Sequence, residues 1–260
     1  MRRLVANKRG QFIIIAILII SIMIISVAGI MYNAVTYFRQ ERWEEYLGMI
    51  DNVEVNTNRL VELSLANYTM TNSTSVLKTN LDKWQRDVMK TYAEFRVVLN
   101  YTLASEDTTI YYNQGLNKTW NQPTSFSAAK TTFRVNVTSV GLTGYKFSTS
   151  VLLRMRILDI TWYQKSERVG VRLNVTMEGL APLSGLQKDN VQFRVNGADI
   201  LNFNMTRYYE KGTYKCFVYE LKYSTETQPP SSVPILVTLI DIRNIKVVSQ
   251  GTFSLTTVNA

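Results

Sequence analysis

The chain has 260 residues, with 29 Lys and Arg against 20 Asp and Glu, so its formal net charge is +9. It contains no histidine and a single cysteine, Cys216. This composition excludes Ser-His-Asp and Cys-His nucleophile pairs, most zinc sites and any intramolecular disulfide. The sequence also lacks a Gly-rich phosphate loop. We therefore expect a protein that is not an enzyme, that needs no cofactor or metal, and that is held together by packing alone.

The dominant feature is an apolar segment near the N-terminus, residues 12–31, with the sequence FIIIAILIISIMIISVAGIM. No charged residue occurs between Arg9 and Arg39. About 20 apolar residues, each rising about 1.5 Å, are enough to cross a hydrocarbon core of about 30 Å. Lipid offers no partners for backbone polar groups, so a segment that enters it must be helical. Residues 11–31 are therefore predicted to form a transmembrane or filament-core helix.

The charges that flank this segment predict its orientation. Four cations precede it, while the distal flank mixes cations with carboxylates; the four are Arg2, Arg3, Lys8 and Arg9. Short basic flanks stay in the cytoplasm, so residues 1–10 are predicted to face inward and the bulk of the chain to be extracellular at the cell surface. A cleavable secretory signal is the alternative, but its apolar region normally has about 7–15 residues and ends in a small-x-small site. The exterior part is then only mildly basic, and no Lys/Arg-rich block indicates nucleic acid.

The junction between the basic flank and the apolar segment reads Lys8-Arg9-Gly10-Gln11. It resembles the leader of archaeal type IV pilin-like proteins. In that family a short basic leader ending in Gly is cut by a prepilin peptidase, and the exposed apolar helix packs into a filament core. The resemblance implies that Lys8 and Arg9 are the basic positions, that the cut follows Gly10, and that Gln11 is the mature N-terminus. Ile15 stands where many members carry Glu, and a plain anchor with an inward N-terminus is the alternative.

The residues after the apolar segment have helical periodicity. Residues 32–66 contain no proline and one glycine, and they read as a continuing helix that breaks near residues 67–74. A second helix is predicted for residues 75–101, where seven apolar residues recur at steps of three and four: Leu77, Leu81, Trp84, Val88, Tyr92, Phe95 and Leu99. The two helices predict a helical hairpin stalk over residues 32–102, whose seam buries this stripe. The alternative is that the stripe forms a groove for a ligand or a partner.

Beyond the stalk the character of the chain changes twice. Residues 103–130 are polar and contain Gly115 and Pro123, which predicts a linker or long loop. From residue 131 the apolar residues alternate, and turn residues separate the runs, which predicts a β-sandwich over residues 131–255. Residues 151–162 are long and apolar, so this strand is expected to be buried on both faces or split by a bend. The predicted strands are 131–138, 145–163, 168–178, 191–196, 200–207, 213–223, 234–242 and 244–254.

One strand carries a motif of immunoglobulin-like (Ig-like) domains. The segment EKGTYKC at residues 210–216 is similar to their acidic-x-Gly-x-Tyr-x-Cys entry to a late strand. The resemblance implies that Tyr214 forms a corner hydrogen bond and that Cys216 is a core position. The partner cysteine of the family is missing, and Trp162 lies early for the core tryptophan. The fold class we predict is therefore α+β, with an N-terminal transmembrane or pilin-like helix, a helical hairpin stalk and a C-terminal Ig-like antiparallel β-sandwich.

The sequence also contains seven Asn-x-Thr sequons for N-glycosylation. At Asn136 and Asn174 the flanking residues alternate apolar and polar, so both asparagines are expected on the outward face of a strand, where a bulky glycan fits. The alternative is that a β protein rich in Thr and Asn makes such triplets by chance. The seven asparagines are Asn67, Asn72, Asn100, Asn117, Asn136, Asn174 and Asn204.

Taken together, these patterns predict a non-enzymatic cell-surface glycoprotein, either a pilin-like or filament-associated structural subunit or an anchored adhesion module. Its expected partners are membrane lipid and other proteins that contact the apolar helix, by self-assembly or within an envelope complex, and not nucleic acid. The alternative is a single-span accessory or sensor subunit of a cell-envelope membrane complex. A chain with about ten cytoplasmic residues has no output domain of its own.

Overall fold

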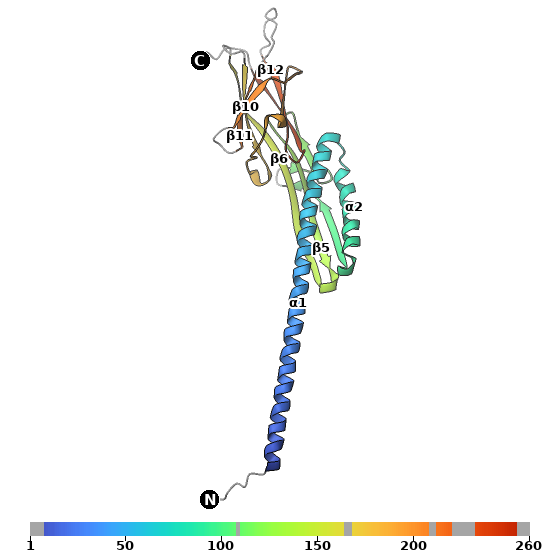
Figure 1. Ribbon diagram of the computed structural model, residues 1–260. Coiled ribbons are helices and arrows are strands. Elements are labelled where there is room, and N and C mark those ends of the chain that lie inside the picture. The colour runs from blue at the N-terminus through green and yellow to red at the C-terminus, as the bar shows by residue number, and fades with distance from the viewer. Residues whose placement is uncertain (1–7, 108–109, 164–167, 208–211, 220–231, 254–260) are drawn as a thin grey trace, which may run out of the picture. The chain divides into compact units, whose positions relative to one another are not determined.

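The computed structural model describes residues 8–107, 110–163, 168–207, 212–219 and 232–253, without the side chains of residues 8–11, 38–43 and 207 (Figure 1). The chain divides into two compact units, residues 1–54 and residues 55–260. Each unit is described by itself.

The first unit contains most of helix α1, Lys8–Thr71, which is 64 residues long. The helix has no proline. Hydrogen bonds from each N–H to the carbonyl four residues earlier therefore satisfy the backbone groups of the apolar segment. Side chains of residues 12–37 are exposed almost throughout, whereas Tyr46, Met49, Ile50 and Val53 are buried at helical spacing. The prediction that residues 12–31 form a helix, continued beyond residue 32, is confirmed.

The second unit begins with residues 55–71 of α1, which pair with helix α2, Val76–Thr91. The chain reverses at Asn72, which has a positive φ of 62°. Side chains join the two helices: the Trp84 indole donates to Thr57 Oγ1 at 2.9 Å, and Asn80 Nδ2 donates to Ser64 Oγ at 2.9 Å. Leu77 and Leu81 are buried in this helix pair, so this part of the stripe belongs to the core.

The second helix is shorter than predicted. It ends at Thr91, Arg96 has a left-handed φ of 51°, and Val97–Leu103 form strand β1. The prediction of helix through residue 101 was wrong because Val97 and Leu99 also fit a period of two. Each residue of β1 pairs with strand β5, Thr124–Val137, which supplies the hydrogen bonds that a longer helix would have made internally.

The predicted linker over residues 103–130 was also wrong, because it contains strands. They are β2 (Glu106–Asp107), β3 (Ile110–Tyr111), β4 (Leu116–Thr119) and the start of β5. The segment is polar overall, but Ser125, Ser127 and Ala129 of β5 are fully buried. Small and hydroxyl residues at inward positions hid the alternation that would have indicated a strand.

The larger sheet is antiparallel and has the strand order β1-β5-β6-β7-β11-β10, with β4 also paired to β5. Its further strands are β6 (Leu142–Tyr163), β7 (Arg168–Thr176), β10 (Phe203–Arg207) and β11 (Thr213–Val218). A second antiparallel sheet has the order β13-β12-β8-β9, with β8 (Val191–Val195), β9 (Ala198–Ile200), β12 (Val233–Ile240) and β13 (Lys246–Phe253). Each of the eight predicted segments contains a strand, but the predicted strand 200–207 is divided between β9 and β10. Residues 220–223 and 254 of the predicted strands lie outside the described residues.

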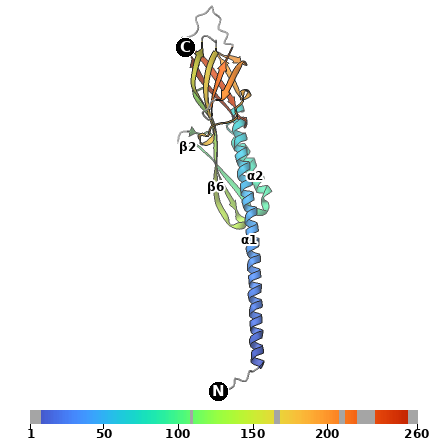
Figure 2. The ribbon, with the colours of Figure 1, turned by 60° about the vertical axis from the view of Figure 1, so that its left-hand side comes forward.

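Both helices and the second sheet lie on the same face of the larger sheet. At the β1 end, Gln85 Nε2 of α2 donates to the Leu99 carbonyl at 2.7 Å. Toward the other end, Ser127 Oγ of β5 donates to the Lys246 carbonyl at 2.6 Å, and Ser249 Oγ donates to the Met155 carbonyl at 3.2 Å. Figure 2 shows α2 and the small β2–β3 hairpin on opposite sides of β6. Within the described residues, β2 lies against the opposite face, called here the open face, where Asp107 Oδ2 is 2.6 Å from Lys130 Nζ of β5. The α+β class is confirmed.

Strand β6 is neither buried on both faces nor sharply broken. Its pairing with β7 shifts between Ile157 and Asp159, which makes Leu158 the extra residue of a β-bulge. Before the bulge the odd-numbered residues, such as Met155, point into the core. After the bulge the even-numbered residues do so, and the Trp162 ring stacks with the Phe253 ring with 6.3 Å between their centroids. The bulge therefore keeps one face apolar along the whole strand.

Candidate functional surfaces

The apolar segment is the first candidate functional surface. Each large apolar side chain from Phe12 to Tyr37 is at least half exposed, from 51% at Ile19 to 74% at Phe12. By length and composition, Phe12–Tyr37 could cross a membrane. An apolar surface of this size is stable only against lipid or another apolar surface. Of the predicted leader residues, Lys8, Arg9 and Gly10 begin α1 and Gln11 continues it, while residues 1–7 lie outside the described residues.

Five of the seven sequon asparagines lie on the open face of the larger sheet. Each follows a buried residue whose side chain points into the core, so the asparagine itself points away from the core. Asn100 and Asn204 are exposed, and the other three are half-buried: Asn117, Asn136 and Asn174. The remaining two, Asn67 and Asn72, are exposed near the end of α1. No glycan is part of the structure, so occupancy stays a prediction.

Hydrogen bonds rank these asparagines as acceptors of a glycan. The amide Nδ2, which would carry the sugar, donates to the Tyr111 carbonyl at 2.6 Å in Asn117 and to Thr213 Oγ1 at 3.3 Å in Asn174. In Asn136 the amide oxygen is engaged instead, accepting from the Gly144 N–H at 2.6 Å. Glycosylation at Asn117 or Asn174 would therefore cost an existing hydrogen bond.

The two residues of the Ig-like motif lie inside the second unit. Tyr214 is 1% exposed, and its hydroxyl donates to the Leu183 carbonyl at 2.8 Å. This acceptor is 31 residues upstream, so the bond ties β11 to a distant loop and not to its own corner. Cys216 is fully buried, and burial raises the pKa of its thiol to about 12. A thiol that stays protonated is a packing residue and a poor nucleophile.

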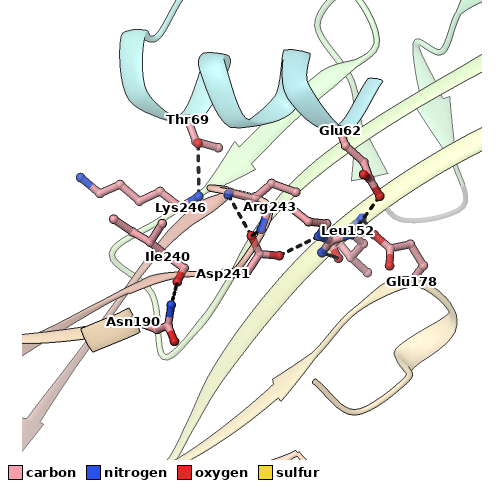
Figure 3. Close-up of polar contacts among 10 residues, drawn as sticks. Glu62, Thr69, Leu152, Glu178, Asn190, Ile240, Asp241, Arg243 and Lys246 are labelled. Atoms are coloured by element: carbon pink, nitrogen blue, oxygen red, sulfur yellow. Dashed lines mark hydrogen bonds and ion pairs between the residues drawn. The ribbon is translucent and has the colours of Figure 1, made fainter. Parts of the chain in front are cut away.

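A charged cluster that the sequence reasoning missed lies beside the second sheet (Figure 3). Its centre is Arg243, in the turn between β12 and β13, with a side chain only 15% exposed. Arg243 Nε donates to Asp241 Oδ2 at 2.7 Å, and Nη1 donates to Glu178 Oε1 at 2.7 Å and lies 3.7 Å from Glu62 Oε1 of α1. The Leu152 carbonyl of β6 accepts from Nη2 at 3.4 Å. The only sequence signal for it is the tripeptide Asp-Ile-Arg after a strand.

The electrostatics of the cluster indicate a structural clamp. Burial alone lowers the pKa of the Arg243 guanidinium, but its bonds to Glu178 and Asp241 outweigh that effect and raise the pKa. Asp241 Oδ1 also accepts from the backbone N–H groups of Arg243 and Ile245, at 3.0 and 2.9 Å. Each charged group is thus satisfied within the fold, and the cluster joins α1, β6, the turn at Glu178 and the second sheet.

The described residues provide little for small-molecule chemistry. No group of three or more His, Cys, Asp or Glu among them could hold a metal ion. An open groove of about 430 Å³ lies where the β8–β9 hairpin meets β10. Two of its charged residues are paired, since Arg194 Nε donates to Asp199 Oδ1 at 2.7 Å. Its aromatic residues, Phe193 and Phe203, pack edge to face with 4.9 Å between their ring centroids.

Comparisons with family models, with curated proteins and with solved structures give no match for this chain.

Proposed function

We propose that this chain is a non-enzymatic cell-surface protein, a pilin-like or filament-associated structural or adhesion subunit that is anchored by its N-terminal helix. The observation that carries the proposal is the exposed apolar segment Phe12–Tyr37 within one long helix. Isolated in water this segment would expose a continuous apolar surface on every side, so it requires lipid or the apolar helices of other subunits. The basic residues before it favour a cytoplasmic N-terminus and an extracellular bulk.

The second unit is suited to presenting a surface. Two antiparallel sheets with a shared core, and a Tyr214-x-Cys216 pair buried in β11, support an Ig-like sandwich that would make the contacts of the subunit. The proposal includes no catalytic residue: the thiol of Cys216 is buried, and the Arg243 cluster is internally satisfied. Sequons on the open face agree with a glycosylated, solvent-facing surface.

Intact mass and N-terminal peptide mapping of the protein from its native membrane test this proposal. We expect a mature N-terminus at Gln11, hexose mass on Asn-x-Thr peptides, and filaments in electron micrographs. If the leader is intact and the chain co-purifies with one membrane protein in a fixed 1:1 ratio, the result would instead favour an accessory or sensor subunit of an envelope complex. A chain that is found free in the medium, cut C-terminal to the apolar segment, would contradict both.

A further inference from the structure

The open face of the larger sheet is strongly basic over β6, β7, β10 and β11. These four strands contain Asp159 as their only carboxylate residue, against seven Lys and Arg. Five of the cations share the open face: Arg154, Arg156, Arg168, Arg172 and Lys215. We call these five residues the basic face. A mildly basic chain thus concentrates positive charge on one surface, which the composition alone did not indicate.

The cations of the basic face repel one another, which is unfavourable for the isolated protein. Arg172 and Lys215 are directly opposite each other on β7 and β11, and like charges in that arrangement destabilise a sheet. Asp159 lies 3.0 Å from Arg172 and neutralises one cation of the five. The Nε atoms of Arg154 and Arg168 are buried and have no hydrogen-bond partner among the described residues. Within the described residues, these two guanidinium nitrogens therefore have no acceptor.

Aromatic rings order two of these cations. The Cζ atom of Arg168 lies 4.5 Å from the centroid of the Phe217 ring and 5.2 Å from the centroid of the Tyr163 ring. The Nζ atom of Lys215 lies 4.9 Å from the centroid of the Phe217 ring. Gly170 makes room for the Tyr163 ring, since a Cβ atom there would be 2.9 Å from Cε2. Such cation–π contacts restrict flexible side chains and hold their charges in place.

We propose that the basic face binds an acidic polysaccharide through its carboxylate or sulfate groups. A sheet face with several cations held in place is complementary to a chain of regularly spaced anions. Base stacking of a nucleic acid is disfavoured because Arg168 and Lys215 occupy the rings of Phe217 and Tyr163. A close-fitting protein partner is disfavoured because Asn204, an exposed sequon asparagine, lies on this same face.

The inference deepens the adhesion part of the proposed function and rests on this face being outside the cell. It does not depend on filament formation, because one chain carries the complete basic face. Loss of polysaccharide binding and absence of filaments are therefore separate outcomes, read by different experiments.

The test measures binding of the full chain, in a zwitterionic nanodisc, to immobilised heparin and polygalacturonate, with neutral dextran as the blank. The variant Arg156→Gln/Arg172→Gln/Lys215→Gln removes three charges from the basic face. The control Lys78→Gln/Lys83→Gln/Lys90→Gln removes three charges from exposed positions of α2. We expect the first variant to lose about tenfold in affinity, from three ion pairs at a surface, and the control to change by less than about twofold.

Several results would overturn the proposal. Equal losses in the two variants would show that net charge alone binds the probe. Absence of binding by the unaltered chain would refute the proposal. Tighter binding to single-stranded DNA or to anionic vesicles than to either polysaccharide would assign the face to another class of ligand. Self-association of the unaltered chain that the basic-face variant abolishes would assign it to a second copy. Matching far-ultraviolet circular dichroism and melting curves exclude misfolding as the cause of a loss.

Discussion

Arg243 joins four segments of the second unit that are distant in sequence. Its guanidinium bonds to Asp241, Glu178 and the Leu152 carbonyl and lies near Glu62. A buried ion pair contributes little against an apolar replacement, but removing one partner leaves charge uncompensated in the interior. Loss of Arg243 would therefore destabilise the fold chiefly because the fully buried carboxylate of Asp241 would be left without its cation.

Arg243→Ala should lower the free energy of unfolding by about 3 kcal/mol, because Asp241 and Glu178 would lose their cation. Urea unfolding of the full chain in detergent, followed by circular dichroism, measures the change. Arg156→Ala is the matched control, since this exposed arginine has no ion pair among the described residues, and it should change stability by less than about 0.5 kcal/mol. Equal effects of the two substitutions would refute the clamp.

Cys216 offers a pH-dependent test of the core. Its pKa is about 12 in the folded state against 9.0 for the reference thiol, so at about pH 8 the folded chain should react with iodoacetamide only when it opens. The raised pKa means that the unfolded thiol ionises first: its stabilising contribution is complete below pH 9.0 and is lost as pH rises toward about 12. The stability difference between the unaltered chain and Cys216→Ala should therefore shrink above pH 9.0. A difference independent of pH, with fast labelling at neutral pH, would mean that the thiol is accessible.

The sequons should differ in occupancy for structural reasons. Asn204 and Asn100 are exposed on the open face, and we expect them to carry glycans ahead of Asn117 and Asn174, whose Nδ2 atoms already donate hydrogen bonds. Asn67 should stay bare because Thr69 of its sequon is buried and bonded to the Ala66 carbonyl and the Lys246 N–H. Glycopeptide mapping by mass spectrometry measures occupancy. A glycan at Asn67 together with bare Asn204 would contradict the ranking.

At the scale of elements, α2 and β1 show where local sequence and tertiary partners compete. The apolar stripe of α2 continues in register through Phe95 and Leu99, so periodicity alone extends the helix. Leu99 instead pairs with Val135 in the sheet and is 1% exposed. Sheet hydrogen bonds and β-branched neighbours outweigh the helical pattern, which no local window can reveal.

Leu81→Ala in α2 should destabilise the second unit by about 3 kcal/mol, because Leu81 is 1% exposed and its removal leaves a cavity between α2 and the core. The unfolding midpoint in urea at constant slope is the measurement. Met89→Ala on the same helix is the control, since Met89 is 43% exposed and its loss should cost less than about 0.5 kcal/mol. Similar midpoints for both variants would place Leu81 outside the packed seam.

At the scale of the whole molecule, the exposed apolar segment is long and apolar enough to anchor the chain in a membrane. Ile20→Arg combined with Ile24→Arg should release the chain from membranes, since each arginine at the centre of a span costs about 2.5–3.5 kcal/mol. Membrane fractionation with alkaline carbonate extraction provides the measurement. The double variant Ile20→Ala/Ile24→Ala keeps the segment apolar and should stay in the membrane pellet. Release of both variants, or of neither, would show that the segment does not act as the anchor.

The sequence by itself determined the apolar helix, the eight strands after residue 131 and the outward positions of Asn136 and Asn174, because each depends on a periodicity contained within a short window. It could not determine β1, whose apolar residues also continue the helical stripe of α2, or β2 to β4, which have only two to four residues each and gain meaning only opposite a partner strand. Nor did it indicate the Arg243 clamp or the basic face. Both bring together residues from separate strands and turns, and only the tertiary fold decides which distant charges meet, because spatial proximity is independent of distance along the chain.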